Sequence, residues 1–184
     1  MQPVMNEFEY LAVIVSIIFG ISLTHILAGA IRSIYQAQFD ETHLVLTAFF
    51  FLVLILNWWT GFQWRDQVIW SFDLFLIIIL WSVTHYVAAI TLYPPQTAGI
   101  EYPIEYRRNW FLWAFIGIAG ADILQTAARG DLLSPRIYLP YVLHYIVIVL
   151  FAIFVNKPGA HRWIAWYLLI VTAIWSFAVR RFLV

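Results

Sequence analysis

The sequence predicts an all-α integral membrane protein, a bundle of six transmembrane helices. Of its 184 residues, 64% are hydrophobic and only 11% are charged, and its mean hydropathy is +0.84. Soluble domains are about 45–50% apolar and about 25% charged, so a chain of this size has too little polar surface to fold in water. Helices are favoured over a barrel because the apolar runs are continuous rather than alternating, and a helix satisfies its own backbone polar groups in lipid.

The first three predicted helices span about 8–35, 43–64 and 68–93. Residues 1–10 contain two Glu and no Lys or Arg, so we expect the first run to be a retained helix and not a cleaved signal, which needs a basic start. Asp40-Glu41 separates the first two runs. The third run ends at Pro94-Pro95, a dipeptide typical of a loop.

The last three predicted helices span about 109–129, 137–156 and 161–182. Gly130-Asp131 and Lys157-Pro158-Gly159 supply the turn residues between them. Each of the six runs has at least the ~20 residues that cross a bilayer. The six runs leave no room for a second domain, so residues 1–184 are expected to form a single transmembrane domain.

Charge and cysteine content exclude several classes of function. Ten Lys and Arg balance ten Asp and Glu, which gives no basic patch for nucleic acid. The chain has no Cys, and therefore no disulfide, thiolate metal site or iron–sulfur cluster. Basic residues divide equally, five and five, between the two predicted sides of the membrane, so the positive-inside rule indicates no orientation.

Two internal similarities appear along the chain. Residues 20–32, GISLTHILAGAIR, match 117–129, GIAGADILQTAAR, at six of thirteen positions. One interpretation is a 3+3 inverted repeat, the arrangement of many transporters; the other is chance, since apolar composition inflates such matches. Separately, Ser22-x-Thr24-His25 recurs as Ser82-x-Thr84-His85, which predicts two His at similar depth on parallel helices.

Small residues on two of the runs predict a helix–helix contact. Ser16, Gly20, Thr24 and Ala28 are spaced by four and form a ridge suited to close packing in a membrane. Gly117 and Ala121 form a similar surface on the fourth run. We therefore expect the first and fourth helices to pack against each other.

Intramembrane ionisable residues are the candidate functional site. Burying an ionised Asp at mid-bilayer costs about 2.5–3.5 kcal/mol, so such groups face inward and find partners. Because His titrates near neutrality, the functional interpretation is a proton or ion path; the alternative is a hydrogen-bonded cluster that only holds helices together. The predicted ligand or ion path consists of His25, His85, Asp122, Arg129 and Arg32.

A second interpretation of the His pair is a cofactor site. His25 and His85 would bind haem b on its two faces, with Arg32 or Arg129 at the propionates. A zinc site at His25, His85 and Asp122 is a weaker alternative, because metalloprotease-like HExxH spacing is absent. No nucleophile, P-loop or dinucleotide motif is present, so we do not expect an enzyme.

Three segments carry a resemblance. FEYLAVIVSIIFGISLTHILAGAIRS, the NWW at Asn57–Trp59 and EYRRNWF before the fourth run resemble small uncharacterised bacterial multi-spanning membrane proteins. The resemblance implies a bacterial inner-membrane location and no particular activity.

The sequence leaves three functions open. The first is a small transporter or channel for a solute, ion or proton. The second is a haem- or quinone-binding redox subunit. The third is a non-catalytic subunit of a larger membrane complex. Expected partners are the lipid bilayer and either further copies of the chain, in a homo-oligomer, or partner membrane subunits.

Overall fold

A computed structural model describes residues 6–36, 40–95, 103–155 and 157–180, which form six α-helices and no strand. The predicted all-α, six-helix fold is confirmed for these residues. Two short helical turns follow α2 and α6: the 3₁₀ turn η1, Phe62–Asp66, and the π-helical turn η2, Trp175–Val179. The helices are α1 Glu7–Tyr35, α2 Glu41–Gly61, α3 Phe72–Leu92, α4 Ile104–Arg129, α5 Tyr138–Phe154 and α6 Pro158–Ile174.

Five helical segments are long and apolar enough to cross a membrane: Glu7–Tyr35, Glu41–Asp66, Phe72–Leu92, Glu105–Arg129 and Gly159–Val179. The apolar helix α5 is shorter, with 17 residues. The protein is thus a multi-pass membrane protein by the length and composition of its helices.

Local signals in the sequence explain where several helices begin and end. Asn6 and Glu9 form a capping box at the start of α1, with hydrogen bonds of 2.8 and 3.0 Å. Asp40 and Ser71 cap α2 and α3 through their side chains. Gly130 ends α4 in the left-handed conformation, with φ of 84°, which glycine adopts without strain.

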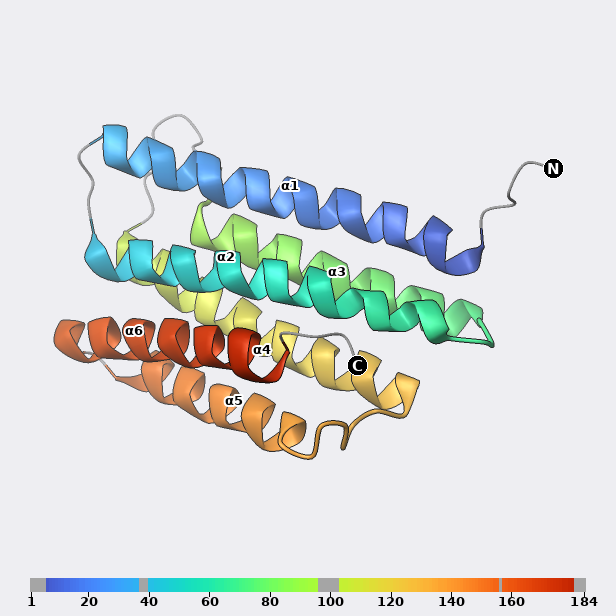
Figure 1. Cartoon of the computed structure of the whole chain (residues 1–184). Coiled ribbons are helices and arrows are strands. Elements are labelled where there is room, and N and C mark those ends of the chain that lie inside the picture. The colour runs from blue at the N-terminus through green and yellow to red at the C-terminus, as the bar shows by residue number, and fades with distance from the viewer. Residues whose placement is uncertain (1–5, 37–39, 96–102, 156, 181–184) are drawn as a thin grey trace.

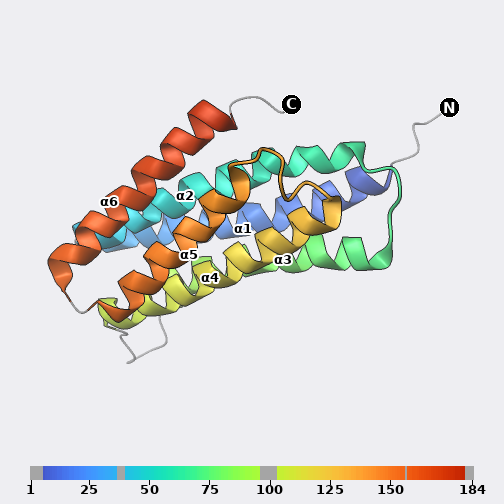
Figure 2. The ribbon, with the colours of Figure 1, turned by 90° about the horizontal axis from the view of Figure 1, so that it is seen from below.

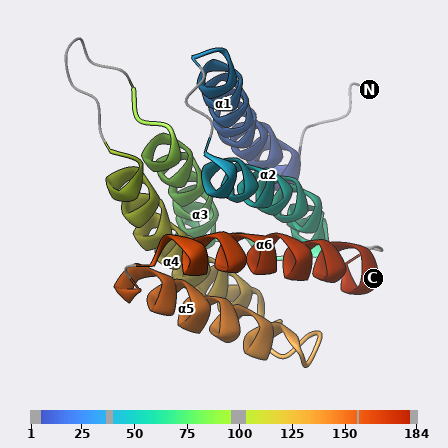
Figure 3. The same ribbon diagram turned by 90° about the vertical axis from the view of Figure 1, so that its left-hand side faces the viewer.

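The helices pack in a defined order. α1 lies on α3 and α2, α3 on α4, α2 on α6 and α4 on α5 (Figure 1). α5 and α6 lie on one side of the bundle, inclined to α1–α4 (Figure 3), and α6 runs beside α2. Figure 2, seen from below, shows α5 and α6 in front of the other helices.

The bundle has two ends, the η1 end and the His43 end. The η1 end holds η1 and the start of α1, where the rings of Phe8 and Phe62 lie 6.5 Å apart. It also holds the end of η2, because Trp59 Nε1 donates a 3.1 Å hydrogen bond to the Arg180 carbonyl. The first and last described residues therefore lie at the same end. At the opposite end, the His43 end, α2, α4 and α6 begin (Figure 1).

An aromatic core fills the middle of the bundle. Phe50 and Phe111 meet edge to face with ring centroids 5.3 Å apart, and Phe49 lies 5.1 Å from Phe115. All four are buried. Close packing of this kind drives helix association in lipid, where burial from water supplies no force between helices.

The predicted contact between the first and fourth helices is wrong. Among the described residues α1 and α4 are not a packed pair, because α3 lies between them. Gly20 is exposed, and a Cβ at Gly20 or Gly117 would meet no atom within 4 Å. The buried face of α1 is instead the neighbouring stripe that includes Leu11, Val15, Phe19 and Ile26, whose larger side chains make more contacts than the small ridge offers.

The packing gives no support to the 3+3 repeat. α1 packs on α3, whereas the corresponding helices α4 and α6 are not a packed pair among the described residues. The similar sequences at 20–32 and 117–129 therefore lie on helices that differ in their packing partners.

Candidate functional site: a polar pocket around Asp122

One face of α4 carries polar side chains toward the η1 end. Asp122, Gln125, Thr126 and Arg129 are spaced by three and four residues, so they share a side of the helix. That side meets Trp81 of α3, and the first residue of α5 and the indole of Trp64 close over it.

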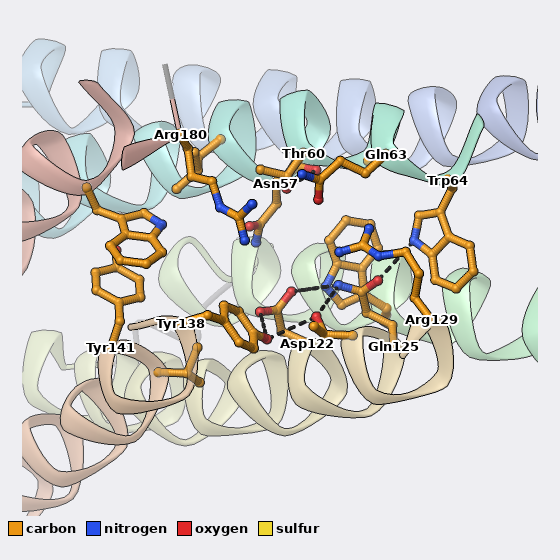
Figure 4. A pocket seen from close by; sticks show the side chains of 16 residues that line it. Asn57, Thr60, Gln63, Trp64, Asp122, Gln125, Arg129, Tyr138, Tyr141 and Arg180 are labelled. Atoms are coloured by element: carbon orange, nitrogen blue, oxygen red, sulfur yellow. Dashed lines mark hydrogen bonds between the residues drawn. The ribbon is translucent and has the colours of Figure 1, made fainter. Parts of the chain in front are cut away.

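Three donors surround the Asp122 carboxyl group (Figure 4). Tyr138 OH donates to Oδ2 at 2.7 Å, while Trp81 Nε1 and Gln125 Nε2 donate to Oδ1 at 3.2 and 3.1 Å. The three come from α5, α3 and α4. A half-buried carboxylate is thus held by hydrogen bonds from three helices, the arrangement that lowers the cost of a charge in a membrane.

A second layer of hydrogen bonds fixes these donors. Trp64 Nε1 donates to Gln125 Oε1 at 2.9 Å, which orients the amide so that its nitrogen faces Asp122. Thr126 Oγ1 accepts from Gln125 Nε2 at 3.0 Å, and its hydroxyl lies 3.0 Å from Tyr138 OH, to which it donates while the tyrosine hydroxyl donates to Asp122. The donor positions are therefore set before any ligand or proton arrives.

Two arginines line the same pocket (Figure 4). Arg129 Nε pairs with Asp131 Oδ2 at 2.6 Å, and its guanidinium carbon lies 5.6 Å from the centre of the Trp64 ring. Burial lowers the pKa of Arg180, the charge of Arg129 lowers it further, and the Asp122 carboxylate opposes both effects. Arg180 thus interacts electrostatically with both groups.

The cavity between these groups has a volume of about 60 Å³. This space is large enough to hold water. Polar side chains form most of its wall, and it reaches the η1 end at Gln63 and Gly61. The polar lining residues are Asn57, Thr60, Gln63, Trp64, Asp122, Gln125, Thr126, Arg129, Tyr138 and Arg180.

His85 adjoins this pocket through two of its lining residues. His85 is fully buried, its Nδ1 lies 2.8 Å from the Trp81 carbonyl, and its Nε2 lies 2.7 Å from Asn57 Nδ2. A carbonyl can only accept, so Nδ1 carries the hydrogen and Nε2 accepts from the Asn57 amide. Trp81 is therefore hydrogen-bonded to both residues: its indole donates to Asp122, and its backbone carbonyl accepts from His85.

The remaining predicted site residues lie elsewhere. His25 is half-buried, and its Nε2 lies 2.7 Å from the carbonyl of Tyr93, toward the His43 end. Arg32 is exposed in the last turn of α1. The structure thus brings Asp122, Arg129 and His85 together and leaves His25 and Arg32 apart from them.

The geometry does not present His25 and His85 as a haem-binding pair. The Nε2 atom that would ligate iron is hydrogen-bonded within the protein in both residues, to different partners. Nor do the described residues include any group of three or more His, Cys, Asp or Glu placed to hold a metal ion.

Sequence reasoning did not assign Tyr138 and Arg180 to this site. Tyr138 begins a helix after an irregular turn, and Arg180 follows the last turn of α6, so no periodicity connects either residue to Asp122. Gln125 and Thr126 lie three and four residues after Asp122, so helical spacing alone places them on its side of α4. Comparison with known protein families, curated proteins and solved structures finds no match for the chain.

Proposed function

We propose that this protein is a small proton-transferring transporter or channel of the bacterial inner membrane. Asp122 takes up and releases a proton at the η1 end, and His85 is the next proton acceptor. The observation that carries the proposal is a half-buried carboxyl group beside a water-sized cavity, bordered by Arg129 and Arg180. A cluster that only held helices together would need the hydrogen bonds but not the cavity.

The hydrogen-bond geometry supports a short relay. Water in the cavity gives Asp122 access to protons, and the neutral His85 offers the unprotonated Nε2 next to Asn57, which lines the same cavity. When Nε2 takes a proton it becomes a donor, and the Asn57 amide must turn its oxygen toward it. Asn57 is therefore a positioning residue that must change its orientation with each proton.

Beyond His85 the path meets the aromatic core. Ala88, Ala89 and Leu92 continue the buried face of α3, and Phe50 and Phe111 lie in the same core cluster. Crossing the membrane therefore requires a second arrangement of the helices that opens toward the His43 end. The proposal stands on the pocket and does not need an inverted repeat.

Proton flux into liposomes tests the proposal. The purified protein is reconstituted in vesicles that contain a trapped pH dye, and a potassium diffusion potential drives the flux. We expect Asp122→Asn to abolish flux above the level of protein-free vesicles. Asp73→Asn is the matched control, because Asp73 is an exposed carboxylate in the first turn of α3. Wild-type flux at the protein-free level, or unchanged flux in Asp122→Asn, would contradict the proposal.

A second candidate, a quinone-binding redox subunit, has one observation in its favour. An apolar groove of about 420 Å³ between α2 and η2 adjoins the polar pocket and shares Leu56 and Arg180 with it. A quinone head would enter the polar pocket and its tail would lie in the groove. Saturable quenching of tryptophan fluorescence by a short-chain quinone, abolished by Leu56→Trp, would favour this candidate.

A further inference from the structure

Basic side chains from three helices gather at the His43 end, the opposite end of the bundle from Asp122. His43 lies in the first turn of α2, Arg107 and Arg108 near the start of α4, and His161 near the start of α6. Figure 1 shows the starts of these three helices side by side. We call these four residues the basic cluster.

The polar atoms of this cluster are buried without partners. His43 and His161 are each only 5% exposed. Both ring nitrogens of His43, Nε2 of His161 and the Nε atoms of Arg107 and Arg108 are buried and make no hydrogen bond. Buried donors normally have partners, because leaving one unsatisfied costs free energy. A neutral imidazole carries one hydrogen, so the donors that lack an acceptor are the Nε–H groups of Arg107 and Arg108 and one ring N–H of His43.

Electrostatic interactions connect the members of the cluster. The positive charge of Arg107 interacts electrostatically with His43 and with Tyr93. The rings of His43 and Tyr93 lie 4.7 Å apart, centroid to centroid. Arg108 acts on His161. Each arginine thus interacts with one of the two histidines, and the two pairs are neighbours because Arg107 and Arg108 are adjacent in the chain.

Helix geometry adds positive potential at the same place. α4 and α6 begin without a side-chain cap, at Pro103 and Lys157. The carbonyls of these two residues accept from the amides at the end of each first turn, and no side chain in the described residues accepts from the amides before them. The positive end of a helix dipole disfavours cations, yet Arg107 and Arg108 lie there. An anion bound here would accept from the helix amides and would neutralise the positive charge of the arginines and the helix dipole.

The neighbouring acidic residues that the structure describes make no ion pair with the arginines, although Glu105 and Asp40 interact electrostatically with Arg108 at longer range. Asp40 caps α2 through a 2.6 Å hydrogen bond from the His43 amide, and Glu41 pairs with Arg162 at 3.7 Å. Glu105 is exposed on α4. Among the described residues no carboxylate lies within ion-pair distance of Arg107 or Arg108.

We propose that the basic cluster binds a phosphate group, carried either by a phospholipid headgroup or by free inorganic phosphate. Guanidinium groups match phosphate oxygens in pairs, and the neutral ring of His43, whose two nitrogens have no partner among the described residues, supplies one further N–H donor. The cluster lies where the apolar helices end, the level at which lipid headgroups sit. This site is at the opposite end of the bundle from Asp122 and does not depend on proton transfer.

Binding to the purified full-length protein in a non-ionic detergent tests the proposal. The probes are inorganic phosphate, dioctanoyl phosphatidylglycerol and dioctanoylglycerol, which has the same chains but no phosphate. Calorimetry gives each Kd, and thermal unfolding gives the shift in Tm. We expect saturable binding of at least one phosphate-bearing probe and none of dioctanoylglycerol at the same concentration. Arg107→Lys keeps the charge but loses paired recognition, so it should weaken binding about tenfold.

The outcomes separate the two sources of phosphate. Binding of inorganic phosphate indicates a free anion, whereas binding of phosphatidylglycerol alone indicates a lipid headgroup. Arg65→Gln is the matched control, because Arg65 is an exposed arginine at the η1 end, and it should leave the Kd unchanged. Arg108→Lys repeats the test if Arg107→Lys does not fold. Failure of the wild type to bind either phosphate probe, or equal Kd values in the wild type and a folded lysine variant, overturns the proposal.

Discussion

Trp81 and Asp122 are joined across the interface of α3 and α4 by a 3.2 Å hydrogen bond from the indole Nε1 to the carboxylate. The carbonyl of the same tryptophan accepts from His85 at 2.8 Å. Trp81 therefore holds both ionisable groups of the proposed relay in fixed positions. Its indole is 2% exposed, so it also closes the cavity toward the core.

Trp81→Phe should lower the stability of the protein. The substitution removes a hydrogen bond to a charged group, and the expected loss in free energy of unfolding is about 1–2 kcal/mol. Thermal unfolding in detergent measures it. Trp163→Phe is the control, because Trp163 is 71% exposed and should leave the Tm unchanged. Equal Tm values for both variants would show that the indole contributes nothing to the fold.

His25 and His85 should differ in their effect on proton flux, although the sequence around them is similar. His85→Gln should reduce flux at least about tenfold, since it removes a proton acceptor. His25→Gln should leave flux unchanged, because His25 contacts the Tyr93 carbonyl and not the pocket. The liposome assay compares both variants. A larger loss in His25→Gln than in His85→Gln would place the path on the other side of α3.

Gly29→Ala should destabilise the protein by about 1–3 kcal/mol. A Cβ at Gly29 would overlap the Cβ, Cγ and Cδ1 atoms of Tyr93, so the ring would have to move. Gly20→Ala is the matched change on the same helix, where a Cβ meets nothing within 4 Å. It should stabilise α1 by up to about 1 kcal/mol through helix propensity. Unfolding in detergent gives both values, and the expectation fails if the two variants shift in the same direction.

Single cysteines should label from opposite sides of the membrane at the two ends of the bundle. The native chain contains no Cys, so one introduced residue reports alone. Asp66→Cys at the η1 end and Lys157→Cys at the start of α6 are both at exposed positions. A membrane-impermeant maleimide should label one in intact cells and the other only after permeabilisation. Labelling of both from the same side would contradict the helix order described above.

The long apolar runs made the helices predictable from the sequence. The spacing of polar residues within those runs made part of the candidate site predictable. Asp122 and Arg129 share a face of α4 because both lie on the same three- and four-residue spacing. Helix bounds departed most at three places: α3 begins at Phe72 and not near 68, α4 at Ile104 and not near 109, and α6 runs Pro158–Ile174 and not 161–182. The start of α4 was missed because Glu105, Arg107 and Arg108 lie in its first turns.

Which neighbour a helix face meets was not predictable from periodicity. His25 and His85 occupy the same motif, yet one faces the end of α3 and the other faces Asn57 of α2. The ridge of small residues through Gly20 was predicted to pack against a helix, but Gly20 is exposed. In a bilayer, surfaces of small and of large apolar residues can both face the lipid. These features depend on packing between helices, which one sequence does not encode in its spacing.

The short length of α5 connects the site to the thickness of the bilayer. Its 17 residues span about 25 Å, less than the ~30 Å of a typical hydrocarbon core. If α5 crosses the membrane with the five longer helices, the lipid beside it must thin to avoid this hydrophobic mismatch, or the ends of the helix sink below the headgroups. Tyr138 is the first residue of α5 and donates to Asp122, so thinning of the lipid beside α5 would bring water and headgroups toward the carboxylate. A membrane of thicker lipids would therefore strain the protein first at Tyr138.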